Sequence, residues 1–191
     1  MVRILVFSGS IRSGSFNTRL AAAAAAELAR LDAEVSLVSL ADYPLPLYDG
    51  DLEANEGIPE PALKLKRQFC GHQGIFIAGP EYNAGITPLL KNAIDWVSRV
   101  KEAGEKPLAA YHGRVFALGS ASPGGYGGMR SQIATRQVLE LGCGALVIPE
   151  TCAVSAAHQA FDDDGNLKDE RTRGMLVACC ASLVAKARSF A

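Results

Sequence analysis

Residues 9–17, GSIRSGSFN, gather polar groups that suit an anionic ligand. Ser10 and Ser15 supply hydroxyls, and Asn17 supplies an amide. Arg12 adds a positive charge with a planar fork of donors. The apolar run RILVF precedes this loop and an alanine-rich run follows it, so the loop is expected to join a strand to a helix N-terminus, where backbone N–H groups favour negative charge. This set predicts a site for a phosphate monoester, which carries nearly two charges.

Two familiar phosphate motifs do not fit this loop. Gly9 and Gly14 have the spacing of a P-loop, but Ser15 stands where the lysine belongs, which argues against nucleotide hydrolysis. The dinucleotide fingerprint GxGxxG is absent. A plain turn in which Asn17 caps the helix is the alternative, and it would leave Arg12 unexplained.

A second loop, residues 79–85 (GPEYNAG), combines an aromatic ring, a carboxylate and an amide in Tyr82, Glu81 and Asn83. A flat heteroaromatic ligand would use such a set. The alternative is a surface turn with Asn83 in the left-handed conformation. No His or Cys lies nearby in the sequence, which argues against covalent hydrolase chemistry.

A third loop, residues 120–128 (SASPGGYGG), holds four glycines, which permit close approach of the backbone to a ligand. A flexible surface loop is the alternative. A phosphate at one end of the site and a flat polar ring at the other indicate FMN.

These loops are expected to meet because of the order of the elements that carry them. Apolar runs predict strands at 3–7, 34–40, 74–78, 114–118 and 145–149, and helix formers predict helices at 17–31, 61–71, 87–100, 129–141 and 166–190. Residues 41–60, with three prolines, are expected to form a long loop. The alternation predicts an α/β three-layer sandwich, and five parallel strands favour the flavodoxin-like order 2-1-3-4-5. Loops after strands 1, 3 and 4 then share one edge.

Composition limits the function further. The chain has 191 residues, 49% of them apolar and 20% charged, which fits a single domain spanning 1–191. The net charge of −1 suggests neither a nucleic-acid nor an acidic-membrane partner. The sequence has no apolar stretch of about 20 residues, no signal peptide and no CxxC pair, so a cytoplasmic protein with reduced thiols is expected. The three histidines have no ligand spacing, and no metal site is expected.

Three stretches resemble the NADPH-dependent FMN reductase family. GSIRSGSFN is similar to its GSxRxxSxN motif, and PEYNAGITPLLKNAIDWVSR, residues 80–99, to its PEYN…LKNAIDW segment. SASPGGYGGMRSQ, residues 120–132, resembles its third glycine-rich loop and the start of the next helix. The matching segments follow the family order up to about residue 149, and the chain after Glu150 carries no such motif.

This resemblance implies a role for thirteen residues. Ser10, Arg12, Ser15 and Asn17, with the backbone of Phe16, would hold the FMN phosphate. Pro80, Glu81, Tyr82 and Asn83 would lie along the isoalloxazine ring, and Ser120, Ser122, Gly124 and Gly125 near its other side. No catalytic side chain is implied, because the chemistry belongs to flavin N5.

The activity that the resemblance implies is an FMN-dependent NAD(P)H oxidoreductase. It would pass a hydride from NAD(P)H to a quinone, a flavin, an azo compound or a metal oxyanion such as chromate, as a homodimer or homotetramer. The alternative is a flavodoxin-like electron carrier without dehydrogenase activity, but such carriers are markedly acidic and this chain is nearly neutral. Neither the physiological acceptor nor the choice between NADPH and NADH follows from these residues.

One position on the helix predicted over 87–100 points to assembly. Thr87 is expected to cap this helix, with Pro88 at its first position. Trp96 lies off the apolar stripe of the helix, and this position predicts an oligomer interface.

Overall fold

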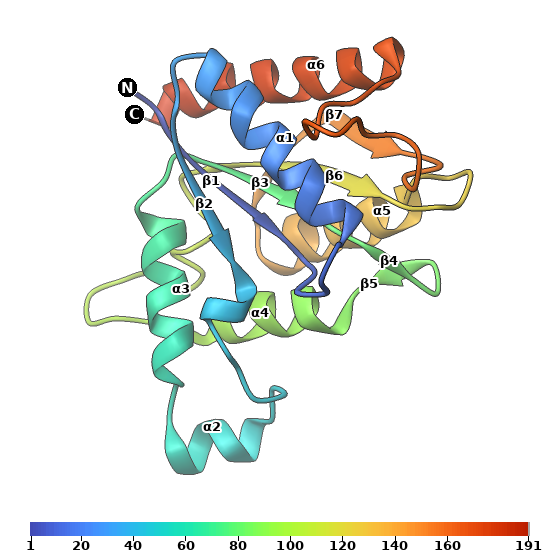
Figure 1. The fold of residues 1–191 in the computed structure, drawn as a ribbon. Helices are drawn as coiled ribbons and strands as arrows, with labels where there is room; N and C mark the ends of the chain where they lie inside the picture. The colour runs from blue at the N-terminus through green and yellow to red at the C-terminus, as the bar shows by residue number, and fades with distance from the viewer. Residues whose placement is uncertain (191) are drawn as a thin grey trace.

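A five-stranded parallel sheet forms the centre of the computed structural model, which describes residues 1–190 (Figure 1). Its strands are β1 (Arg3–Ser8), β2 (Glu34–Ser39), β3 (Gly74–Ala78), β6 (Val115–Ala121) and β7 (Leu146–Val154). They are arranged in the order β2-β1-β3-β6-β7, and every neighbouring pair is parallel. The flavodoxin-like prediction, 2-1-3-4-5 when the strands of this sheet are counted along the chain, is confirmed.

Helices cover both faces of the sheet (Figure 1). One face packs against α1 (Phe16–Arg30) and α6 (Glu170–Ala187), and the other against α3 (Glu60–Cys70), α4 (Pro88–Arg99) and the π-helical turn Val138–Gly142 that continues α5 (Met129–Gln137). Short 3₁₀ turns lie at Leu40–Asp42 and Arg188–Phe190. Each face therefore has its own apolar cluster, separated by the sheet.

The helices that carry the first two loops follow their sequence signals closely. In α1, Ala21 and Ala24 are buried beside Leu20 and Leu28, and their small side chains let the helix lie close to the sheet. In α4, Thr87 is the N-cap, and its hydroxyl accepts a hydrogen bond from the backbone N–H of Leu90. Both loops are thus anchored on rigid elements.

The long loop predicted over residues 41–60 is wrong in part, because it contains the helix α2 (Gly50–Glu56). Asp49 caps this helix, and its carboxylate accepts from the N–H groups of Asp51 and Leu52. No residue of α2 is buried, so the helix lacks the apolar periodicity on which the prediction relied. The N-cap at Asp49 was a local sequence signal for the start of this helix.

Three other elements have bounds that differ from those predicted. β6 and β7 both extend further than predicted, and β7 includes Pro149 beside a shift of register. A proline without an N–H is tolerated there because β7 is an edge strand. The last helix begins only at Glu170, where Asp169 caps it, since the residues before it pair in a bridge between Phe161 and Leu167.

The prediction of an oligomer interface at Trp96 is also wrong. Trp96 is fully buried beneath the chain's own segment 43–58. Its indole N–H donates to the carbonyl of Pro46 at 2.7 Å, and the ring of Tyr48 meets it edge-on at 5.1 Å between centroids. Part of the segment predicted as a long loop therefore covers this face of α4.

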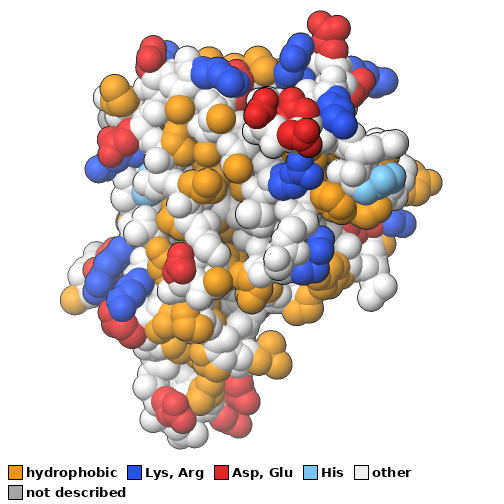
Figure 2. All heavy atoms as spheres, viewed as in Figure 1, with side chains coloured by type: hydrophobic (Ala, Val, Ile, Leu, Met, Phe, Trp, Pro, Cys, Tyr) orange, Lys and Arg blue, Asp and Glu red, His pale blue; other side chains and the backbone are white. Residues whose placement is uncertain are grey.

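Charges on the face seen in Figure 2 are interspersed in sign over most of the molecule, and acidic side chains gather around α2. Within residues 1–190, no helix combines the length and apolar character needed to cross a membrane. The same residues hold no group of three His, Cys, Asp or Glu side chains placed to bind a metal ion.

Candidate functional site

The three predicted loops meet at the carboxyl edge of the sheet, around a cavity of about 120 Å³. Nine of the thirteen predicted site residues line it: Ser10, Arg12, Ser15, Phe16, Asn17, Pro80, Glu81, Tyr82 and Ser122. Ala121 and Pro123 complete the lining. The other four predicted residues, Asn83, Ser120, Gly124 and Gly125, lie outside it. Residues up to 113 positions apart in the chain therefore form one site, as the edge rule for parallel sheets predicts.

The phosphate loop, residues 9–17, presents unused donors at the start of α1. Ser15 is the N-cap, and its oxygen accepts from the N–H of Asn17 while its own O–H stays available. Within residues 1–190, the backbone N–H groups of Phe16 and Thr18 have no acceptor. Free N–H groups at a helix N-terminus are the groups that bind an anion.

Arg12 extends from the phosphate loop without a carboxylate partner in the described part of the chain. Its guanidinium donates to the carbonyl of Ser13 at 3.2 Å, and its side chain is exposed. Ser10 accepts from the Arg12 backbone N–H at 3.3 Å, which leaves the Ser10 hydroxyl proton free. An unneutralised cation beside several free donors fits a group with two negative charges.

Asn17, at the end of the same loop, connects the loop to the end of β6. Its side-chain N–H donates to the carbonyl of Ala121 at 2.8 Å, and its side-chain oxygen accepts from the Ala121 N–H at 2.9 Å. Asn17 is buried. One N–H and the oxygen of the amide thus hold the phosphate loop against the end of β6, and the second amide N–H has no acceptor within residues 1–190.

The second loop is a short hairpin of β4 (Glu81–Tyr82) and β5 (Gly85–Ile86). Asn83 and Ala84 form its turn with φ of 49° and 64°, the left-handed pair typical of two-residue hairpins. Tyr82 is 55% exposed at the rim of the cavity. Asn83 is exposed at the tip of the hairpin.

Glu81 is held by a residue that sequence reasoning missed. Arg130, in the first turn of α5, donates through Nε to Glu81 Oε1 at 2.8 Å and also through Nη2. The Arg130 backbone N–H donates to Oε2 at 3.2 Å, and the hydrogen bonds to this carboxylate raise the pKa of Arg130. A cation in the first turn of a helix opposes the helix dipole, and that conflict was the signal that Arg130 needs a partner.

Ser120 belongs to the frame of the third loop. Its hydroxyl is fully buried, donates to the carbonyl of Gly127 and accepts from the side-chain amide of Gln132, both at 2.7 Å. The same amide of Gln132 also donates to the carbonyl of Cys152. The predicted Ser120 hydroxyl is thus committed within the protein.

Glycine is required in the third loop at two positions other than those predicted to lie near the ring. Gly127 and Gly128 have φ of 59° and 85°. A Cβ at Gly127 would lie 2.9 Å from backbone atoms at the end of β7, and one at Gly128 2.8 Å from the Cβ of Ser120. Gly124 and Gly125 are exposed and have ample space around them.

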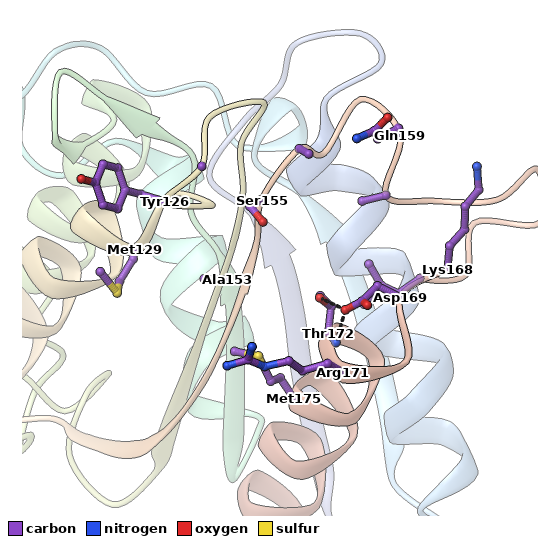
Figure 3. Close-up of a pocket in the computed structure, with 14 residues that line it drawn as sticks. Tyr126, Met129, Ala153, Ser155, Gln159, Lys168, Asp169, Arg171, Thr172 and Met175 are labelled. Carbon is purple, nitrogen blue, oxygen red and sulfur yellow. Dashed lines mark hydrogen bonds between the residues drawn. The ribbon is translucent and has the colours of Figure 1, made fainter.

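A second, larger cavity of about 730 Å³ adjoins the third loop (Figure 3). It lies between Gly125 and Tyr126 of that loop, the end of β7 and the start of α6. Sequence reasoning missed it because the chain after Glu150 carries no recognised motif. Its basic residues, Lys168 and Arg171, stand beside the predicted N-terminus of the last helix and were not singled out.

Comparison with known proteins agrees with this geometry. The family model of NADPH-dependent FMN reductase matches residues 2–159. The chain is 36% identical to the NAD(P)H-dependent FMN reductase PA1204 of Pseudomonas aeruginosa, over 92% of this chain and 89% of that protein. It is 35% identical to an NADPH:quinone oxidoreductase of Arabidopsis thaliana, over 97% and 91%.

A solved structure gives the same picture. The flavoenzyme NAD(P)H:(acceptor) oxidoreductase FerB of Paracoccus denitrificans superposes with a TM-score of 0.80 at 28% identity, and the match covers 100% of this chain and 99% of that one. The sequence matches and the fold match thus agree with the family resemblance of the three loops. The chain belongs to the NADPH-dependent FMN reductase family.

Proposed function

We propose that the protein binds FMN where its three loops meet and uses it to transfer electrons from NAD(P)H to a small acceptor, which is thereby reduced. The acceptors we propose are a quinone, a flavin, an azo compound or a metal oxyanion such as chromate. The observation that carries the proposal is one cavity that joins an unneutralised Arg12 and free helix N–H groups to the Pro80–Tyr82 hairpin.

The phosphate end of FMN fits the donors of residues 9–17. Arg12 would form a charge-assisted contact, and the hydroxyls of Ser10 and Ser15 with the Phe16 N–H would add neutral donors. Asn17 would donate its second amide N–H to the phosphate while its other amide groups keep the loop against β6. These local donors would bind a dianionic group although the net charge of the protein is −1.

The ring end would lie against Pro80, Glu81 and Tyr82 on one side and Ser122 with Gly124 and Gly125 on the other, and Asn83 would approach from the hairpin tip. FMN held by these residues would supply the hydride- and electron-transfer chemistry between NAD(P)H and the acceptor. The backbone N–H groups of Gly125 and Tyr126 have no acceptor within residues 1–190, which suits hydrogen bonding to the polar rim of a ring. The protein's part is to bind and orient.

We also propose that the protein assembles as a homodimer or homotetramer through α5. Met129, Ile133 and Leu141 are 45%, 60% and 82% exposed; the first two lie one turn apart on α5, and Leu141 lies about two turns further on, in its π-helical continuation. Leu146, at the start of β7, is half exposed beside them in sequence. Large apolar side chains repeated along one helix are typical of a contact surface. This stripe replaces Trp96 as the interface candidate.

The state of the cysteines supports a cytoplasmic location. All five are free thiols, and four of them are buried. Burial raises the pKa of Cys143 to about 11, which keeps that thiol protonated and unreactive. Free thiols persist in reducing compartments.

Titration of the flavin-free protein with FMN tests the proposed site. Arg12→Ala should weaken binding by about 1.5–3 kcal/mol, because a charge-assisted phosphate contact is lost. Arg30→Ala is the matched control, since Arg30 lies at the other end of α1 and pairs only with Glu27 among the described residues. Equal FMN affinity of the Arg12→Ala variant and the unmodified protein would remove Arg12 from the site.

A further inference from the structure

The 730 Å³ cavity shares the third loop as a wall with the smaller cavity of the proposed FMN site. Ser122 and Pro123 line the smaller cavity, and Gly125 and Tyr126, two residues further on, line the larger one. The volume falls within the usual range for small-molecule sites, about 300–1,000 Å³. A ligand whose reactive end reaches the proposed flavin site can therefore extend into a ready-made space next to it.

The larger cavity has one apolar and aromatic wall. Tyr126 and Met129 form it from the third loop and α5, and Met175, on α6, lies across the cavity from them (Figure 3). The Arg130 guanidinium lies over the Tyr126 ring, 5.1 Å from its centroid, and because Tyr126 is 65% exposed the other face of the ring is available to a flat group. Aromatic and thioether side chains of this kind favour contact with a heteroaromatic base.

The opposite wall carries more positive than negative charge, with Lys168 and Arg171 against the single carboxylate of Asp169. Figure 3 shows Arg171 extending from the first turn of α6 toward Ala153 and Met175, and Lys168 standing at the rim near Gln159. Within residues 1–190, neither side chain has a hydrogen-bond or ion-pair partner. Cations that face a cavity without a partner favour an anionic ligand.

The carboxylate of this lining already has hydrogen-bond partners within the protein. Among the described lining residues Asp169 alone is acidic, and its Oδ2 accepts from the Thr172 N–H at 2.7 Å and from the Thr172 hydroxyl at 2.6 Å. These hydrogen bonds cap α6. Asp169 is thus held by the helix, and the two cations outnumber it.

We propose that this cavity binds the adenosine phosphate end of the nicotinamide coenzyme, with Arg171 and Lys168 on its phosphate groups and Tyr126 beside its base. The inference rests on the proposed function, because it presumes that the coenzyme's other end meets the flavin. It adds a substrate-binding role for the start of α6, a part of the chain beyond residues 2–159, which the family model matches.

The test measures binding of 2′,5′-ADP to the FMN-loaded protein by isothermal titration calorimetry. Arg171→Ala should weaken this probe about tenfold or more, and Lys168→Ala severalfold, because each loses a charge-assisted contact. The matched control is Arg173→Ala, which removes the same charge from the same exposed helical turn but lies outside the cavity. In steady-state assays, Arg171→Ala should raise the KM for NADPH and leave kcat and FMN affinity unchanged.

Two results would overturn this inference. One is an unmodified protein that does not bind 2′,5′-ADP, and the other is equal losses in Arg171→Ala and Arg173→Ala. Failure of the proposed function would appear separately, as a protein that does not bind FMN or whose flavin NADPH does not reduce. A protein that passes both of those checks but shows unchanged probe affinity in Arg171→Ala contradicts the coenzyme site alone.

Discussion

Asn17 and Ala121 are joined by a two-way pair of hydrogen bonds, at 2.8 Å and 2.9 Å, across 104 positions of sequence. The pair connects the first residues of α1 to the last residue of β6, and both partners are buried. It holds the phosphate loop in register with the third loop. Two of the three walls of the proposed FMN site are thus fixed to each other before any ligand binds.

Replacement of Asn17 should therefore destabilise the whole fold. Asn17→Ala removes both hydrogen bonds and leaves the buried N–H and C=O of Ala121 unpaired, so the free energy of unfolding should fall by roughly 2–4 kcal/mol. Urea denaturation followed by circular dichroism measures this. Ser13→Ala, at an exposed position of the same loop, should change it by less than about 0.5 kcal/mol. Equal stability of the two variants would contradict the role assigned to Asn17.

The ion pair of Glu81 with Arg130 should position the hairpin for the ring of FMN. Arg130→Ala frees the hairpin from the start of α5, and FMN affinity should fall roughly two- to tenfold. A double-mutant cycle with Glu81→Gln supplies the control. Because both variants break the same ion pair, the double variant should lose little more FMN affinity than either single variant. Fully additive losses would show that the two residues act independently.

Burial of His72 at the opposite edge of the sheet should make stability depend on pH. Its Nδ1–H donates to the Gln68 carbonyl at 2.6 Å, and Nε2 accepts from the Ser36 hydroxyl at 2.8 Å, an arrangement that suits the neutral ring. Burial lowers the pKa of His72 below its usual 6.5, with Arg3 and Arg114 adding to the effect and the Gln68 carbonyl and Glu34 opposing it.

The unfolded chain then binds a proton that the folded one rejects, so this contribution to stability is present above about pH 6.5 and is lost as the pH falls below it. Urea midpoints at pH 7.5, 6.5 and 5.5 should decline in that order, and His72→Gln should flatten the decline. If the variant retains the full slope, other groups cause the pH dependence.

Trp96 and the α5 stripe should respond differently to mutation. Trp96→Phe loses the bond to the Pro46 carbonyl and some packing, so stability should fall by about 1–3 kcal/mol with no change of oligomeric state. Ile133→Glu places a charge on an exposed apolar position and should shift the mass measured by light scattering toward the monomer. If the mass changes with Trp96→Phe and not with Ile133→Glu, the interface lies elsewhere.

The sheet and its loops were predictable from sequence because their signals are local. Runs such as GIFIA at Gly74–Ala78 are buried on both faces and read as strands without knowledge of the rest. The order of elements then placed the three loops at one edge. The same logic brought together nine of the predicted site residues, although they come from three separate segments.

The features that could not be predicted from the sequence depend mainly on contacts between distant segments of the chain. The amide of Asn17 has the right type for a ligand contact, and only the structure shows that one of its N–H groups and its oxygen also bind Ala121, 104 positions later. Trp96 lies off the apolar stripe of α4, and its burial depends on a segment some fifty residues earlier, at Pro46. The helix α2 has no buried face, so its local signs were the cap at Asp49 and the glycine at its end, Gly57.

The most direct test of the central claim is a visible spectrum of the purified protein reconstituted with FMN, recorded before and after NADPH is added without oxygen. We predict bound flavin whose absorbance near 450 nm is bleached by NADPH and returns when a quinone is added. Absence of bound flavin after FMN is supplied would contradict the site. Bound flavin that neither NADPH nor NADH bleaches would contradict the activity and favour an electron carrier.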